Sequence, residues 1–244
     1  TPRALLEPTV VPSQANLASS LTSTQQKCLF AEANQWLKQG TAQHRQGNTM
    51  AALADFQQAL QDFRTLSEPD SEAKVLLVMA HLYYGLADYL WAVDYARQGL
   101  LIARRLADKS LIHQALSCLG NSYRHLGDLE KAQNCMTQSL SLAQEMVDME
   151  AEMRTLSNLA LVYRVQGETE KAVQLYERSL LLAEAQPDST AIEQILRNLG
   201  NTYHALGNPQ KTIEYYDRLL RLSRNQMDPS VVNKILRNLH SACY

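Results

Sequence analysis

Apolar and small residues recur along the chain with the spacing of an α-helix rather than that of a strand. Within residues 116–123, Leu, Leu, Gly and Tyr stand at i, i+3, i+4 and i+7, which is one stripe of a helix. The same stripe returns at 156–163, with Ala in place of Gly, and at 196–203. A Gly and a polar residue follow each stripe, and Gly at such a position ends helices in a left-handed conformation. These breaks are Gly127-Asp128, Gly167-Glu168 and Gly207-Asn208.

A second helical stripe follows each break, so the pattern predicts pairs of helices joined by short turns. The small residue of the first helix lets the two helices cross closely, and we expect it to face an Ala of the second helix. The members of the second stripes are Ala132, Met136 and Ser139; Ala172, Tyr176 and Ser179; and Thr212, Tyr216 and Leu219.

The helix pairs repeat with a period of 40 residues. The segments 78–92, 118–132, 158–172 and 198–212 align without a gap. A shared register predicts five full repeats and the first helix of a sixth. The small residue at the centre of the first helix marks that register, at Gly40, Ala80, Gly120, Ala160 and Gly200, with His240 at the next step.

Composition agrees with an all-α protein and excludes several function classes. Of 244 residues only 9 are Gly and 7 are Pro. The net charge of −2 gives no basic excess that would draw the chain to nucleic acid or anionic lipid. No apolar run approaches the roughly 20 residues that span a bilayer, so direct membrane insertion is not expected.

Catalytic and cofactor signatures are missing from the sequence. There is no Walker loop, no GxSxG and no zinc spacing, since His240-x-x-Cys243 is a lone pair. We therefore predict a protein that is not an enzyme and needs no cofactor or metal. The four cysteines form no CxxC, which favours reduced thiols in a cytoplasmic location.

The N-terminal part of the chain differs from the repeats. Pro-containing, Ser/Thr-rich residues 1–24 predict a flexible leader, and residues 25–244 the repeat domain. Ser23 and Gln26 have the spacing of a capping box for the first helix. Both tryptophans, Trp36 and Trp91, are expected at packing positions.

The first repeat carries a family resemblance. It resembles the tetratricopeptide signature, W-x3-G followed by A-x3-F-x2-A, and this likeness extends over residues 33–244. Its period of 40 instead of the usual 34 is similar to the long-repeat branch that includes the LGN/Pins-type adaptors. The resemblance implies a right-handed α-solenoid of tandem helical hairpins, with longer helices or linkers taking up the extra residues. The residues that match the signature are Trp36, Gly40, Gly47, Ala52, Phe56 and Ala59.

In this family the first helices line the concave side of the solenoid, and a partner segment binds there. The corresponding columns of this sequence contain Asn, Gln, Arg, Lys and His but no Asp or Glu. Asn can donate to and accept from a peptide backbone, and Arg can bind a carboxylate through two hydrogen bonds. We therefore expect an adaptor that binds an extended, acidic segment of another protein. The candidate peptide-binding residues are Asn121, Arg124, Arg154, Asn158, Arg164, Arg197, Asn198 and Asn201.

Other interpretations stay open at this point. The arginines can be a solvated surface, and the asparagines can bridge neighbouring helices instead of binding a ligand. The chain can be a self-assembly module that forms a homo-oligomer through its C-terminal helix, where Leu236, Leu239 and Cys243 lack a second helix. It can also be the peptide-sensing domain of a larger bacterial regulator.

Overall fold

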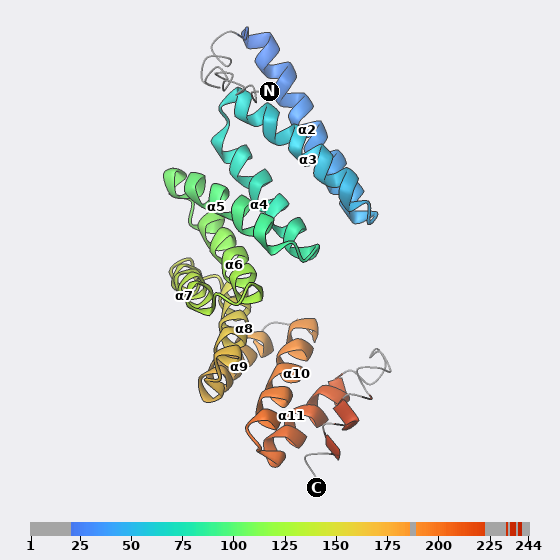
Figure 1. Cartoon of the computed structure of the whole chain (residues 1–244), viewed down its shortest axis with the longest axis vertical. Coiled ribbons are helices and arrows are strands. Elements are labelled where there is room, and N and C mark those ends of the chain that lie inside the picture. Colours follow the sequence, from blue (N-terminus) through green and yellow to red (C-terminus); the bar gives the residue numbers. More distant parts are fainter. Residues whose placement is uncertain (1–20, 186–188, 223–232, 234, 238, 241–244) are drawn as a thin grey trace, which may run out of the picture.

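A computed structural model describes residues 21–185, 189–222, 233, 235–237 and 239–240 of the chain. Within these residues the protein is all-helical, as predicted, and its helices follow one another as antiparallel pairs stacked along one long axis (Figure 1). The five pairs are α2 (Ser23–Arg45) with α3 (Thr49–Leu66), α4 (Pro69–Gly85) with α5 (Tyr89–Leu106), α6 (Lys109–His125) with α7 (Leu129–Glu145), α8 (Met149–Gln166) with α9 (Thr169–Glu184), and α10 (Ser189–Ala205) with α11 (Pro209–Leu222).

The two ends of the chain lie mostly outside the described residues. Residues 1–20 of the expected leader are among those outside, and so is most of the expected sixth-repeat helix. Of the expected oligomerisation surface, Leu236 is exposed, Leu239 packs against the core of the last hairpins, and Cys243 lies outside the described residues. Helix α2 begins at Ser23, two residues before the expected domain boundary. The capping box expected at Ser23 is formed one residue earlier by Thr22 and Gln25, because Thr22 still has an extended backbone while Ser23 is already helical.

Left-handed residues end the helices at intervals of 20 along the chain. Helices α4 to α8 each contain 17 or 18 residues, and Leu126–Asp128 is the whole connection between α6 and α7. The period of 40 therefore comes from long helices and not from long linkers. The residues with positive φ include the three predicted glycines and are Gly47, Ser67, Ala87, Ala107, Gly127, Val147, Gly167 and Gly207.

Polar residues directly after these left-handed positions begin the next helices. Asp108 Oδ1 accepts a hydrogen bond from the Leu111 N–H at 2.9 Å, which satisfies one of the free donors of the first turn of α6. The Asp128, Asp148 and Asn208 side chains do the same for α7, α8 and α11. Local sequence therefore accounts for these helix starts and for the ends at glycines, whereas Ser67, Ala87, Ala107 and Val147 are left-handed without being glycine.

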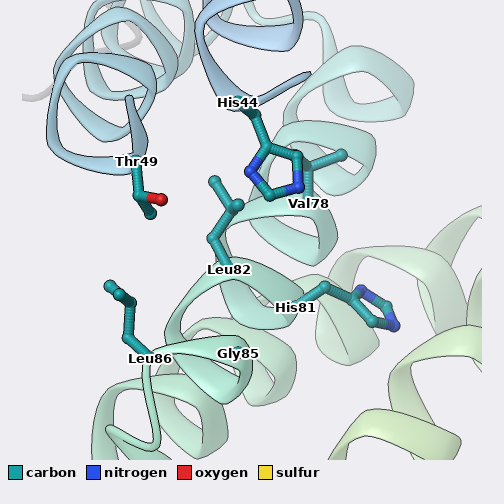
Figure 2. Close-up of a pocket in the computed structure, with 7 residues that line it drawn as sticks. All are labelled: His44, Thr49, Val78, His81, Leu82, Gly85 and Leu86. Carbon is teal, nitrogen blue, oxygen red and sulfur yellow. The ribbon is translucent and has the colours of Figure 1, made fainter. Parts of the chain in front are cut away.

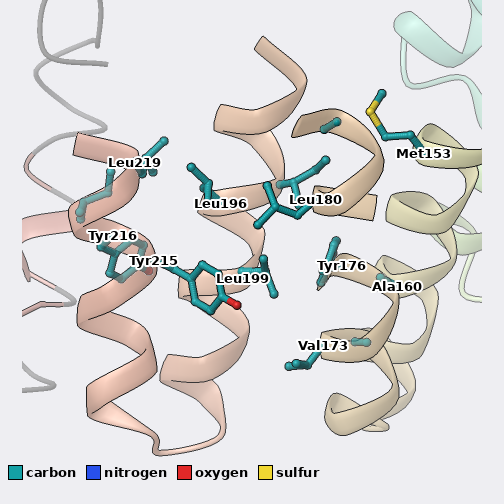
Figure 3. Close-up of a cluster of buried hydrophobic side chains, with 14 residues drawn as sticks. Met153, Ala160, Val173, Tyr176, Leu180, Leu196, Leu199, Tyr215, Tyr216 and Leu219 are labelled. Atoms are coloured by element: carbon teal, nitrogen blue, oxygen red, sulfur yellow. The ribbon is translucent and has the colours of Figure 1, made fainter. Parts of the chain in front are cut away.

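The glycine at the centre of α2, α6 and α10 makes room for a large side chain of the second helix. A Cβ atom at Gly200 would lie 2.5 Å from Tyr216 Cε1, and one at Gly120 would lie 2.7 Å from Met136 Cε. The expectation that the small residue faces an alanine was thus wrong for these glycines, because the closest approach is filled by the larger residue four positions after Ala132 or Thr212. Tyr216 and its repeat equivalent Tyr176 are fully buried in the core around α8 to α11 (Figure 3).

The two tryptophans differ in their surroundings. Trp36 packs against the core of the first repeat, as expected. Trp91 was expected to pack as well, but it is 52% exposed and stacks on Tyr83 at the edge of its hairpin, with 6.1 Å between ring centroids. The equivalent residues forty and eighty positions later are Lys131 and Lys171, each of which lies over a tyrosine ring of the preceding helix. Position 91 is therefore an edge position and not a core position.

Candidate functional site

A pocket of about 510 Å³ lies between the first helices of three successive repeats. We call it the central pocket. Helix α4 contributes two residues, α6 six, and α8 with the turn before it the remaining seven. Its lining residues are His81, Tyr84, Ser110, His113, Gln114, Ser117, Cys118, Asn121, Met146, Asp148, Glu150, Ala151, Arg154, Thr155 and Asn158.

Two further pockets continue the central pocket toward the N-terminal end of the stack. One, of about 300 Å³, shares His81, Ser110 and Gln114 with the central pocket. It also shares Val78 and His81 with an apolar pocket between α2, α3 and α4. In Figure 2 the apolar pocket is bordered by His44, Leu82 and Leu86, among other residues. The shared residues make these three pockets one groove that crosses α2, α4, α6 and α8.

Two asparagine amides of the central pocket are available to a ligand. Asn121 lies on α6 and Asn158 on α8, and both are partly exposed. Neither side chain makes a hydrogen bond within the part of the chain that the structure describes. An amide has both donor and acceptor atoms, so the two asparagines can pair with the N–H and C=O groups of an extended peptide.

The charges of the groove are more balanced than expected. Asp148 and Glu150 line the central pocket, so the prediction of an acid-free wall was wrong. Glu150 Oε1 lies 3.6 Å from Arg154 Nη1, but both side chains are mostly exposed and a pair of this kind contributes little. Arg154 is 72% exposed and keeps most of its donors free for another acid. The error arose because Asp148 is the N-cap of α8 and Glu150 stands in its first turn, both before the repeat columns that contain the predicted site residues.

His113 anchors the floor of the central pocket. Its Nε2 lies 3.1 Å from Thr155 Oγ1, which joins α6 to α8. Burial lowers the pKa of His113, because the charged imidazolium loses hydration in this position. Thr155 Oγ1 also donates to the Ala151 carbonyl at 2.7 Å, so its lone pair is directed at the imidazole, and His113 lies in the groove as a neutral donor.

Two aromatic rings, those of Tyr89 and His125, pack against Tyr84, which lines the pocket. The His125 ring stacks on Tyr89 with 4.4 Å between centroids, and Tyr84 Oη lies 3.2 Å from His125 Nε2. Arg124 Nη2 donates to the same nitrogen at 2.8 Å, which requires an unprotonated Nε2. Burial lowers the pKa of His125, and the charge of Arg124 lowers it further, in agreement with this arrangement. Arg124 is therefore held at the end of α6 by its neighbours.

Three of the eight predicted site residues meet in the central pocket, namely Asn121, Arg154 and Asn158. The other five, which do not line it, are Arg124, Arg164, Arg197, Asn198 and Asn201.

The two remaining asparagines, Asn198 and Asn201, lie on α10 and have structural roles or are buried. Asn201 Oδ1 accepts a hydrogen bond from Tyr216 Oη at 2.8 Å, so this asparagine bridges α10 and α11. Asn198 is only 7% exposed. The interpretation of some asparagines as helix bridges is thus confirmed for Asn201. Arg197 lies beside them, and its Nε is buried without a hydrogen-bond partner in the described residues.

The site residues predicted from the sequence did not include the N-terminal turns of the first helices. Ser110 and Glu150 stand four residues before the column that contains Gln114 and Arg154, which places them on the same helix face. Extending that column by one turn would have found both. His113 gave no comparable signal, because its place in the groove depends on contact with Thr155 of the next repeat.

The described residues hold no group of three or more His, Cys, Asp or Glu side chains arranged to bind a metal ion. None of their helices combines the length and the apolarity that a bilayer crossing requires. Cys28, Cys118 and Cys135 are free thiols, and burial raises the pKa of Cys118 to about 11.

Protein-family comparisons identify the repeats. Models described as tetratricopeptide repeat match residues 113–145 and 151–225. No curated protein sequence matches the chain. These matches identify tetratricopeptide repeats within residues 113–145 and 151–225, and the hairpins before them follow the same register.

Solved structures share the fold at low sequence identity. BtubC (BKLC) from P. vanneervenii is 19% identical, with a TM-score of 0.70 over 90% of this chain and 95% of that one. A Rap protein complexed with Competence and Sporulation Factor is 17% identical, with a TM-score of 0.72 over 94% of this chain and 66% of that one. A putative kinesin light chain repeat protein of Podosopora anserina is 17% identical, with a TM-score of 0.66 over 78% of this chain and 93% of that one. The protein is thus an α-solenoid of tetratricopeptide type.

Proposed function

We propose that this protein is an interaction adaptor that binds an extended segment of a partner protein in the groove formed by α2, α4, α6 and α8. The observation that carries the proposal is the continuity of three pockets along the first helices, through shared residues such as His81. A continuous groove suits an extended chain better than a compact small molecule.

The chemistry of the groove indicates what such a segment contains. Asn121 and Asn158 suit its backbone, and the exposed guanidinium of Arg154 suits an acidic side chain. Toward α2 the groove becomes apolar, with Val78, Leu82 and Leu86. We therefore propose a segment that has an acidic residue at one end and an apolar residue at the other.

Peptide selection followed by mutation tests the proposal. A random peptide library would be displayed against the purified chain, and the affinity of enriched peptides would be measured by fluorescence anisotropy. We expect Arg154→Glu to weaken binding at least tenfold, since it turns an attraction into a repulsion. Asn158→Ala should weaken it by about three- to tenfold through loss of backbone hydrogen bonds.

Arg105→Glu is the matched control, because Arg105 is also exposed but lies on α5, outside the lining of the three pockets. It makes the same charge change and should alter affinity less than twofold. Enriched peptides that bind Arg154→Glu and Asn158→Ala as tightly as the wild type would refute the groove as the binding site.

The finer parts of the proposal follow from the same features. The period of 40 residues is the reason to retain the likeness to LGN/Pins-type adaptors, and the reduced cysteines are the reason to propose a cytoplasmic location.

A second candidate function is peptide sensing within a larger regulator, which the likeness to a Rap protein complexed with Competence and Sporulation Factor supports. Self-assembly remains a third proposal, and light scattering at several protein concentrations distinguishes it from binding by a monomer.

A further inference from the structure

Trp91 departs from a pattern that two later repeats share. The equivalent residue of α7 is Lys131, and its Nζ lies 2.6 Å from Oδ2 of Asp128, three residues earlier. In α9 the same ion pair joins Lys171 to Glu168. Each lysine also lies over a tyrosine ring of the preceding helix, with 5.5 Å between Lys131 Nζ and the ring centroid. Each of these turns therefore holds a cation between a carboxylate and an aromatic ring.

The turn between α4 and α5 has the carboxylate and the aromatic ring but no cation. Asp88 stands forty residues before Asp128, and Tyr83 stands forty residues before Tyr123. The Asp88 side chain makes no hydrogen bond or ion pair within the residues that the structure describes. No described Lys or Arg lies over the ring of Tyr83 or Trp91. The carboxylate of this turn therefore lacks the positive charge that its equivalents have.

Trp91 presents an aromatic face to solvent at the place of the missing cation. The indole stacks on Tyr83, with 6.1 Å between centroids, and Tyr83 stacks in turn on Tyr95 at 5.3 Å. This stack holds the indole in place while 52% of Trp91 stays exposed. Among aromatic side chains, tryptophan attracts a cation to its ring face most strongly.

Two exposed carboxylates flank the indole on the surface of α5. Asp88 precedes Trp91 by three residues and Asp94 follows it by three, and residues three apart are neighbours on a helix. Asp94 accepts a hydrogen bond from Gln98 Nε2 at 2.8 Å but forms no ion pair in the described part of the chain. Arg97, six residues after Trp91, lies on a different side of the helix. The ring and both carboxylates attract a cation, whereas an anion would be repelled.

We propose that Asp88, Trp91 and Asp94 form a docking site for a lysine or arginine side chain of a partner protein. The partner supplies the positive charge that Lys131 and Lys171 supply within their own repeats. None of the three site residues lines the pockets of the groove, so this site does not depend on peptide binding there.

Blocked amino acids test the site without a known partner. The backbone amide resonances of residues 88–94 would be followed by NMR during titration at constant ionic strength. Acetyl-lysine amide and acetyl-arginine amide carry the cation, and acetyl-norleucine amide has a similar side chain without the charge. We expect saturable shifts with the lysine compound, the arginine compound or both, and none with the norleucine compound.

Variants show whether the ring and the carboxylate take part. Trp91→Lys introduces the residue of the later repeats, so it should fold, and its own cation should reduce the affinity at least tenfold. Asp88→Asn and Trp91→Phe should each weaken binding by about two- to fivefold. Glu170→Gln is the matched control, because Glu170 is an exposed acid in the first turn of α9, and it should leave the affinity unchanged. Circular dichroism verifies that each variant is folded.

A displayed peptide library tests whether the cation belongs to a protein. We expect enriched peptides that contain Lys or Arg and that bind the wild type and Arg154→Glu equally well but not Trp91→Lys. Saturable binding of the blocked amino acids without any such peptide would overturn the assignment to a partner protein.

Two other results would overturn the site itself. One is a shift that stays linear with concentration or that is equal for the norleucine compound. The other is unchanged affinity in both Trp91→Lys and Asp88→Asn. The groove is tested separately by Arg154→Glu, so either proposal can fail while the other stands.

Discussion

Gly200 offers the sharpest test of how the hairpins pack. A Cβ at this position would lie 2.5 Å from Tyr216 Cε1 and 2.7 Å from Cδ1, closer than side chains approach one another. The tyrosine has little freedom to move, because its ring is fully buried and its hydroxyl is bonded to Asn201. The variant Gly200→Ala must therefore push α10 and α11 apart. Overpacking of this kind costs about 1–3 kcal/mol.

The same substitution also raises helix propensity, and this gain must be separated from the packing cost. Replacing Gly by Ala within a helix stabilises it by about 1 kcal/mol when nothing else changes. Gly85 is the matched control, since it is the last residue of α4 and a Cβ there would have no atom within 4 Å. We expect Gly85→Ala to stabilise the protein and Gly200→Ala to destabilise it, with a difference of about 1–3 kcal/mol between them.

Urea unfolding followed by circular dichroism measures this difference. Ala160 stands at the equivalent place above Tyr176 in the preceding repeat, so a hairpin spacing that admits a methyl group exists, and the Gly200→Ala variant should still fold. The double variant Gly200→Ala/Tyr216→Leu should recover stability, as the ring that blocks the methyl group is gone. Equal stabilisation by Gly200→Ala and Gly85→Ala would refute the packing of Tyr216 against Gly200.

Two other predictions concern stability. Val147 is a β-branched residue that is 83% exposed and has a φ of 56°. Glycine adopts this left-handed conformation without strain, so Val147→Gly should raise the free energy of unfolding by about 1 kcal/mol. A loss of stability in urea unfolding would contradict this prediction. Burial lowers the pKa of His113 below its usual 6.5, so the unfolded chain binds more protons than the folded one between the two pKa values. The contribution of neutral His113 to the free energy of unfolding is fully present above pH 6.5, and it is lost as the pH falls toward the pKa of His113 in the folded protein. The fall in stability from pH 7 to pH 5 should be smaller in His113→Asn, and an identical pH profile would exclude His113 as its source.

Much of the fold follows from local sequence. The left-handed glycines such as Gly127, and the capping residues such as Asp128, stand where the helices end because their effects reach only one turn of the chain. The spacing of Leu116, Leu119 and Gly120 similarly marks the buried face of α6. A period that recurs in register adds these local signals together, so a single sequence is enough to predict the hairpins and their stacking.

Several properties of the groove do not follow from the period. Asp148 and Glu150 enter it because α8 begins close to α6, although no acid stands in the columns that the repeats share. Trp91 occupies an exposed edge, while Trp36, which the signature also places in the array, packs on the core. Equivalent positions have equivalent backbones but not equivalent neighbours.

By itself the sequence determined an all-α array of 40-residue hairpins, the glycines that end three of its helices and the buried stripes of the last three repeats, because these depend on residues a few positions apart. Only the tertiary structure decided which side chains meet across the hairpins. Tyr216 donates to Asn201, whereas the equivalent pair forty residues earlier is Tyr176 and Leu161, and the Tyr176 hydroxyl has no hydrogen-bond partner among the described residues. The physical reason is that a polar group's partner lies on another helix, and its identity varies freely from one repeat to the next while the backbone that carries it stays the same.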